Sequence, residues 1–169
     1  VQIDAQGDIV KDFPAIKQDL MNTGFVKNVA LADHNTLGGG NNTTGINWQG
    51  KDPNSNIVIS QRLVSQEFMS TTGMHIVEGR DFQPADEIEF GDNHMPKDSN
   101  QNFNVLVTQS MEKLLGKGSA IGKTMQRPFN NGTFHLRVTG VVRDYVYGDM
   151  YGQSAPVIFY DIPGAAILL

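Results

Sequence analysis

The stretch Leu63–Phe82, LVSQEFMSTTGMHIVEGRDF, constrains the fold of this chain more than any other part of it. Over Asn56–Val64, which leads into this stretch, apolar and polar residues alternate, and that spacing predicts a strand. Ser65 then stands where its side chain can cap a short helix that ends at Thr72. Gly73 follows where a left-handed residue closes such a helix. The chain is therefore expected to pass directly from a strand into a short helix.

A second strand is predicted over Met74–Val77, and Gly79–Phe82 forms the turn after it. The start of the chain has the same order of elements, with strands predicted over Val1–Val10 and Phe25–Ala32. The helix between them is indicated by apolar residues at helical spacing: Phe13, Ile16 and Leu20. Two β-α-β units of this kind predict an α+β fold built on a split four-stranded sheet, with the helices on one face.

The ends of the first helix also carry recognisable signals. Asp12 is a candidate N-cap, and Pro14 would then fall in the first turn, where its missing N–H does no harm. Asn22–Gly24 closes the helix. A further helix is predicted after Thr108, and the second half of the chain adds strands at Asn104–Val107, Lys123–Arg127, His135–Tyr145 and Pro156–Tyr160.

Two polar insertions interrupt these elements, at His34–Asn56 and at residues 83–103. Neither Gly38–Thr44 nor Pro84–Asn102 has apolar residues at core spacing, so ordering them would cost backbone entropy with little burial in return. We expect these two segments to be the most mobile parts of the chain.

Composition excludes several classes of protein. The 169 residues carry a net charge of −5 with no basic run, which excludes a nucleic-acid partner, and the absence of cysteine excludes disulfides and thiol chemistry. No run of apolar residues approaches the ~20 that a membrane-spanning helix needs. The chain begins at Val1 and ends on an apolar tail, Ala165–Leu169, so we expect it to be a piece of a longer protein.

Gly116–Thr124, GKGSAIGKT, invites comparison with a phosphate-binding loop. That loop requires a glycine five residues before the Gly-Lys pair, and this position is occupied by Lys117. The loop also follows a predicted helix rather than a strand. We therefore interpret the segment as a turn that leads into a strand, and we predict no cofactor site.

The second insertion is acidic, and clustered carboxylates can bind hard cations. Its spacing matches no calcium-binding loop, and the histidines are scattered singly, so no metal-ligand set is predicted. The residues concerned are Asp81, Asp86, Glu87, Glu89, Asp92 and Asp98, with His34, His75, His94 and His135. No nucleophile motif is present, so we predict no catalytic residue.

Two further residues have alternative interpretations. Trp48 could stack on a sugar or a partner, although a single tryptophan in a short strand more often packs onto the core. Arg80, which follows Gly79, could bind a carboxylate partner in a bidentate manner, although its place at a turn favours an ion pair within the fold.

The order of several short motifs resembles the periplasmic core domain of MacB/FtsX-like ABC-transporter permeases. The matching residues of the first stretch are Val64, Ser65, Glu67, Phe68, Gly73, Met74, Gly79, Arg80 and Phe82. Later landmarks follow in the same order at Val105–Ser110, Ile121–Lys123 and Val138–Asp144. The ordered set of motifs spans roughly residues 57–160.

The resemblance implies a two-lobed extracytoplasmic domain on the periplasmic side of the bacterial inner membrane. A porter-like lobe would comprise residues 1–79 and be completed by 153–169, and a smaller mixed lobe would be inserted at 80–152. Such a domain has no catalytic residues and couples ATP hydrolysis by a cytoplasmic subunit to work outside the membrane. The implied partners are its own membrane helices before and after this piece, the ATPase, a periplasmic adaptor protein and a second copy in the full transporter. The alternative is a free-standing solute- or glycan-binding module, with Trp48 and the Asn-rich loop as its recognition surface. A metal-dependent hydrolase that uses the acidic insertion is a third, weaker hypothesis.

Overall fold

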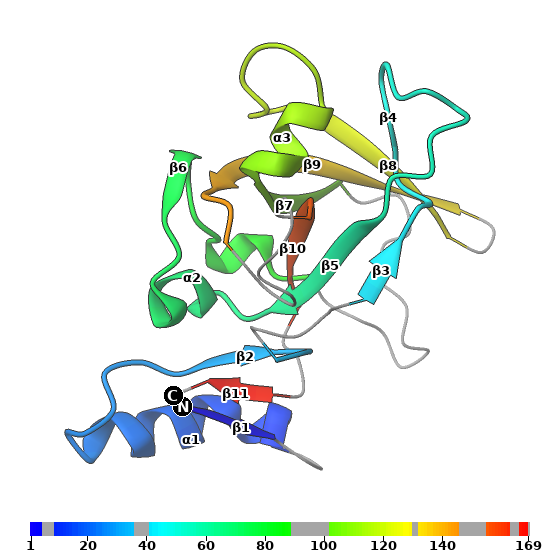
Figure 1. Cartoon of the computed structure of the whole chain (residues 1–169). Helices are drawn as coiled ribbons and strands as arrows, with labels where there is room; N and C mark the ends of the chain where they lie inside the picture. Colours follow the sequence, from blue (N-terminus) through cyan, green and yellow to red (C-terminus); the bar gives the residue numbers. More distant parts are fainter. Residues whose placement is uncertain are drawn as a thin grey trace.

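The computed structural model of the chain describes residues 1–4, 9–35, 41–88, 102–129, 132–145, 155–162 and 166–168. At its centre four strands lie side by side in the order β5 (Ile59–Val64), β10 (Val157–Asp161), β7 (Asn102–Thr108) and β9 (Gly132–Val142). Pairing is parallel between β5 and β10 and between β7 and β9, and antiparallel between β10 and β7. This mixed centre forms the main sheet (Figure 1).

Shorter strands occupy both edges of the main sheet. On the β9 side, β8 (Thr124–Phe129) pairs with the first half of β9 and β6 (Ile76–Gly79) with its last residues, while β4 (Asn47–Trp48) pairs with β8. On the β5 side, β3 (Asn41–Thr43) pairs with the first half of β5. The β3 strand lies within the first polar insertion, so part of that insertion belongs to the sheet.

Helices cover both faces of the main sheet. Successive strand residues point to opposite sides, so neighbouring residues of β10 contact different helices. Ile158 and Tyr160 of β10 face a core cluster that includes Met111 of α3 (Gln109–Leu114). Val157 and Phe159 face a second cluster with Phe68 and Met69 of α2 (Phe68–Thr72). The prediction that helices lie on one face is therefore wrong for this sheet.

The first and last elements form a smaller group that we call the terminal unit: β1 (Gln2–Asp4), α1 (Ile9–Asn22), β2 (Ala30–Ala32) and β11 (Ala166–Leu168). In this unit β11 lies between β1 and β2 and is antiparallel to both, so β1 and β2 are parallel. This is the predicted split β-α-β arrangement. Phe13 of α1 packs with Val29 and Leu31, and Ile16 and Leu20 lie against them, so the predicted helix face is confirmed.

The mixed α+β class is confirmed, but the sheet is larger than the four strands predicted, since eleven strands of the described residues join one network. Figure 1 shows the terminal unit below the main sheet, with the two chain ends side by side. The lobe boundaries at 79/80 and 152/153 stay a prediction. The strands β6 and β9, on either side of the first boundary, are neighbours in the sheet, and residues 146–154 lie outside the described part.

Several predicted ends of helices and strands near the start of the chain are wrong. The first strand ends at Asp4 and α1 already begins at Ile9, so Asp12 lies within the first turns and Pro14 lies inside the helix. The strand predicted from Phe25 begins only at Ala30. Gly24 has a φ of +76° and the Phe25 N–H donates to Thr23 Oγ1, a turn that leaves the Phe25 side chain 95% exposed.

The second insertion also contributes to the fold. Pro84–Asp86 forms a 3₁₀ turn, η1, and both Asp86 and Ile88 are buried. Residues 89–101 lie outside the described part, so the predicted mobility of the two insertions stays a prediction. No helix of the described residues is long and apolar enough to cross a membrane.

Candidate functional site

The terminal unit meets the main sheet where β2 lies beside the end of β5, and we call this contact the junction. A single residue pair, Ala32 and Val64, is in β register there. The Asp33 N–H donates to the Leu63 carbonyl and the Ser65 N–H to the Leu31 carbonyl, both at 2.9 Å. These bonds flank Ala32 and Val64, which makes them a non-hydrogen-bonded antiparallel pair. The sheet is therefore continuous at the junction but very narrow.

Side chains of the first motif reinforce the junction. The Ser65 hydroxyl accepts the Leu31 N–H at 3.0 Å. It makes no cap hydrogen bond to α2, whose N-cap position is Glu67, so the predicted capping role of Ser65 is wrong. The competing Leu31 N–H belongs to a strand 34 residues away in sequence. The serine thus joins the terminal unit to the main sheet.

Two further polar contacts connect the terminal unit to α2. The Lys17 ammonium of α1 forms an ion pair with Glu67, and Asn28 Nδ2 donates to Ser70 Oγ at 2.9 Å. Burial opposes ionisation of Glu67, but the hydrogen bond from Lys17 and further hydrogen bonds outweigh it, so the pKa of Glu67 is lowered. Glu67 therefore stays charged at neutral pH and holds Lys17. These three contacting residues, Lys17, Asn28 and Ser70, were not found from the sequence.

Small residues bring the two parts into close apolar contact. Ala30 and Ala32 of β2 belong to the same buried cluster as Val64, Phe68 and Phe159. The rings of Phe68 and Phe159 are tilted with centroids 6.0 Å apart. The α2 helix is thus packed between the terminal unit and the main sheet, and the predicted apolar role of Phe68 and Met69 is confirmed.

The glycines of two motifs are opposite each other in the antiparallel pairing of β6 and β9, where Gly79 faces Gly140. A Cβ on Gly79 would lie 2.3 Å from the Thr139 carbonyl oxygen, and one on Gly140 would lie 2.2 Å from the Arg80 carbonyl oxygen. Gly79 also has a φ of +76°, which disfavours any other residue. The two backbones can approach this closely only because both positions lack a side chain.

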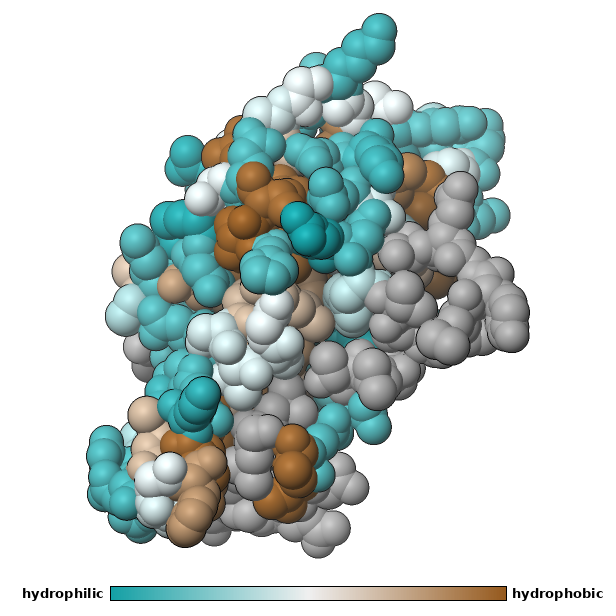
Figure 2. Space-filling view, turned by 60° about the vertical axis from the view of Figure 1, so that its left-hand side comes forward, coloured by the Kyte–Doolittle hydropathy of each residue, from teal (hydrophilic) through white to brown (hydrophobic). Residues whose placement is uncertain are grey.

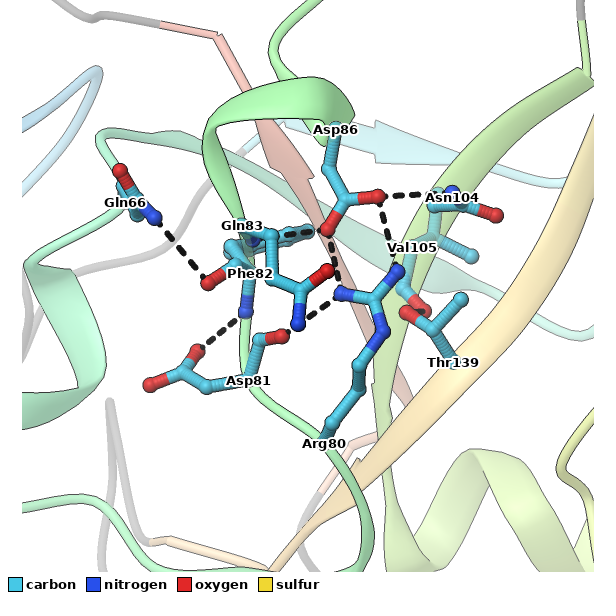
Figure 3. Close-up of polar contacts among 9 residues, drawn as sticks. All are labelled: Gln66, Arg80, Asp81, Phe82, Gln83, Asp86, Asn104, Val105 and Thr139. Atoms are coloured by element: carbon cyan, nitrogen blue, oxygen red, sulfur yellow. Dashed lines mark hydrogen bonds and ion pairs between the residues drawn. The ribbon is translucent and has the colours of Figure 1, made fainter.

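Arg80 forms an ion pair inside the fold, as predicted (Figure 3). Its two terminal nitrogens donate to the two carboxylate oxygens of Asp86 at 2.5 and 3.0 Å. Asn104 Nδ2 and the Gln83 N–H also donate to Asp86. Burial alone would raise the pKa of Asp86, but the bonds from Arg80 and then Asn104 lower it. Arg80 is committed to this network, which fixes η1 to β7.

A second buried carboxyl lies beside the junction. Asp161 is adjacent to Val64 in the β10–β5 register and is 2% exposed. Its Oδ2 has no hydrogen-bond partner within the described residues. Burial, and then the charges of nearby Glu87 and Asp86, with Glu67 and Asp81, raise the pKa of Asp161 to about 7. The carboxyl therefore titrates near neutral pH.

In the Gly116–Thr124 loop, backbone carbonyl groups accept hydrogen bonds from the loop's own lysine, whereas a phosphate-binding loop would present backbone N–H groups. The Lys123 ammonium donates to the carbonyl oxygens of Leu115, Gly116 and Lys117, each at 3.1 Å. These carbonyls follow the end of α3, where unpaired carbonyl groups carry partial negative charge. The strand after the loop begins at Thr124, close to the predicted Lys123. The interpretation as a turn is confirmed.

Trp48 packs at the edge of the larger core cluster, with Lys51 Nζ 4.9 Å from its ring centroid. It also borders a cavity of about 350 Å³ together with Gln49, Leu115, Gly122, Lys123 and Thr124. The preferred interpretation of Trp48 as a core residue is thus confirmed. The cavity remains the feature that a binding module would use.

The acidic and histidine candidates do not converge in the described part of the chain. No group of three or more His, Asp or Glu side chains there could hold a metal ion. His34 lies beside Asp33, His75 is exposed and His135 lies on β9. Glu89, Asp92, His94 and Asp98 lie outside the described residues. The prediction that the chain has no catalytic, cofactor or metal site stays a prediction.

Comparison with known proteins gives structural matches alone. No protein-family model and no curated protein matches the chain. The structure matches the periplasmic region of MacB from Actinobacillus actinomycetemcomitans with a TM-score of 0.53 and 17% identity, covering 98% of this chain and 71% of that one. The fold is that of a MacB-like periplasmic domain. The extracellular domain of the noncanonic ABC-type transporter YknZ from Gram-positive bacteria matches with a TM-score of 0.51 and 17% identity, over 94% and 70% of the two chains.

Proposed function

We propose that the chain is the extracytoplasmic domain of an ABC-transporter permease, on the periplasmic side of a bacterial inner membrane. The observation that carries this proposal is the fold, which matches two extracytoplasmic transporter domains over nearly the whole chain. In the full protein the partners are membrane helices before and after this piece, a cytoplasmic ATPase, a periplasmic adaptor protein and a second copy. The domain itself is non-catalytic.

Its role is to couple ATP hydrolysis to work outside the membrane through movement of the terminal unit against the main sheet. The chain ends lie on neighbouring strands, since Gln2 is opposite Leu168, so membrane helices would act on the terminal unit together. That unit is joined to the main sheet by one residue pair in register, a few polar contacts and the apolar cluster that includes Ala30 and Ala32. Because only one residue pair is in β register there, movement at the junction breaks few backbone hydrogen bonds.

A disulfide across the junction tests this role. Ala32 and Val64 are a non-hydrogen-bonded antiparallel pair, whose Cα atoms lie about 4.5 Å apart, within the range for a disulfide. The chain has no cysteine, so Ala32→Cys with Val64→Cys gives a single defined bond. Gln126→Cys with His135→Cys is the matched control, because these residues are opposite each other on β8 and β9, away from the junction.

In the full-length protein, oxidation of the junction pair should abolish transport while ATP is still bound and hydrolysed, and a reductant should restore transport. The variant with the control pair should transport equally well in its oxidised and reduced states. Equal transport by the oxidised and reduced junction variants would show that no movement at the junction is needed.

The alternative, a free-standing solute- or glycan-binding module, is favoured by one observation, the cavity beside Trp48. A longer gene product with membrane spans on both sides of this piece would exclude it. Sugar binding that is lost with Trp48→Ala, in a gene product without such spans, would establish it.

A further inference from the structure

The loop between α1 and β2 presents an aromatic side chain to solvent in an ordered turn. Phe25 is 95% exposed, the highest value among the large apolar residues of the described chain. The turn before it is fixed, because Thr23 Oγ1 donates to the Leu20 carbonyl and the Gly24 N–H to the Met21 carbonyl. An exposed phenylalanine held in place, rather than on a loose tail, is a side chain available for contact.

The other end of the loop is fixed as well. Asn28 Nδ2 donates to Ser70 of α2, and Asn28 Oδ1 accepts the Val29 N–H at 3.0 Å. The loop is thus held at both ends beside the small core of the terminal unit. That core is already filled by Phe13, Val29 and Leu31.

Strand register places this loop at the same end of the terminal unit as both chain ends. Gln2 is opposite Leu168, and Leu168 is in turn opposite Ala30. The three residues are therefore level across the small sheet. The start of β1, the end of β11 and the start of β2 therefore lie at one edge of the small sheet, which Figure 1 shows beside the labels N and C.

Apolar exposure is concentrated in the same unit. Of the seven large apolar residues that the described chain exposes, four belong to the terminal unit or the loop within it: Val1, Ile3, Met21 and Phe25. Figure 2 shows apolar surface on the terminal unit, at the lower end of the view. Met21 lies next to the Phe25 turn through the bond from Gly24. Lys27, also exposed, follows Phe25 by two residues.

We infer that the Phe25 loop contacts the surface of the lipid bilayer, with the ring in the interfacial region and Lys27 near anionic headgroups. This inference rests on the proposed function, because the bilayer lies at this edge only if the chain ends continue into it. A phenylalanine ring can be buried at the boundary between headgroups and acyl chains, and a nearby lysine adds electrostatic attraction to anionic lipids. The contact would set how the terminal unit sits on the membrane while the main sheet stands away from it.

The test attaches the chain to a membrane and measures where the loop lies. A C-terminal histidine tag binds the chain to nickel-chelating lipid in vesicles of phosphatidylethanolamine and phosphatidylglycerol. A polarity-sensitive fluorophore is placed on Phe25→Cys, which is unique because the chain has no cysteine. The matched control is Val58→Cys, an apolar residue of the main-sheet side that is 52% exposed.

The label at position 25 should shift to shorter wavelength on attachment and be quenched by spin-labelled lipid, whereas the label at position 58 should do neither. A label at position 25 that stays in water, or a quench that comes from a second labelled copy instead of lipid, would overturn the inference. Equal quenching at both positions would overturn it too.

A second measurement tests the ring itself. Retention of the tagged chain on vesicles with a limiting amount of nickel-chelating lipid should fall about tenfold or more for Phe25→Ser, because burial of an aromatic ring is lost, and should not change for Val58→Ser. Equal retention of both variants would contradict a role for the ring. Because the tag supplies the membrane attachment in the first experiment, failure of the label to enter the lipid leaves the proposed function intact. Conversely, a full-length protein without membrane spans would refute the proposed function even if the label enters the lipid.

Discussion

Replacement of Gly79 by alanine tests the close approach of the β6 and β9 backbones. The new Cβ would lie 2.3 Å from the Thr139 carbonyl oxygen and 2.6 Å from Ile121 Cδ1. Ile121 is 37% exposed and its side chain can move aside. The Thr139 oxygen belongs to the backbone and accepts the Arg80 N–H at 3.0 Å, so it can move only if the two strands separate.

The cost follows from three contributions. A φ of +76° costs a residue with a Cβ about 1–2 kcal/mol. Overpacking adds about 1–3 kcal/mol, and loss of the Arg80 hydrogen bond about 1 kcal/mol. Gly79→Ala should therefore lower the free energy of unfolding by about 3–6 kcal/mol.

Gly116→Ala is the matched control, since Gly116 has a φ of +87° but no atom within 4 Å of the position that a Cβ would take. It should cost about 1–2 kcal/mol from the backbone conformation alone. Urea unfolding followed by Trp48 fluorescence gives both values by linear extrapolation. If the two variants lose the same stability, the close approach of β6 and β9 contributes nothing and the steric reasoning is refuted.

Three further predictions concern charged residues. Asp161 holds its proton in the folded state up to a pKa of about 7 and in the unfolded state only to about 4, so stability should fall as pH rises between these values. Asp161→Asn should remove this dependence of stability on pH and stabilise the chain by up to about 4 kcal/mol at pH 8. Urea unfolding of both proteins at pH 5 and pH 8 measures this, and an equal change of stability with pH in both would contradict it. Asp86→Ala leaves Arg80 and Asn104 without the carboxylate that they share and should cost about 3 kcal/mol. The control is Asp19→Ala at an exposed position of α1, which should cost almost nothing. Lys123→Met should cost about 2 kcal/mol because three carbonyl groups lose a charged donor, and calorimetry of the unaltered chain with Mg²⁺ and ATP should show no heat; micromolar binding would mean that the loop does accept phosphate.

Local patterns predicted those parts of the fold that depend on neighbouring residues. The spacing of Phe13, Ile16 and Leu20 identified the buried face of α1, and Gly73 closes α2 with a φ of +72° as expected. The Gly-Arg turn correctly placed Arg80 in an internal ion pair. In each case the cause lies within a few residues of the pattern.

Contacts between distant segments were not predictable from spacing. Ser65 and Thr108 both precede a helix, yet Ser65 accepts from Leu31 and Thr108 from the Val157 N–H at 3.0 Å, because strand neighbours compete for their hydroxyls. Lys17 and Glu67 are 50 residues apart, and neither carries a local signal of pairing. The junction therefore emerges only from the fold.

The central claim is that the terminal unit moves against the main sheet during ATP hydrolysis. Spin labels on Asp19→Cys in α1 and Val58→Cys beside β5 report this movement directly in the cysteine-free chain. The distance between the two spin labels in the full-length protein, measured by pulsed electron-spin resonance, should differ between the ATP-bound and nucleotide-free states. A disulfide between Ala32→Cys and Val64→Cys, formed before labelling, should abolish this difference. A single distance distribution that is unchanged by nucleotide would contradict the proposed coupling.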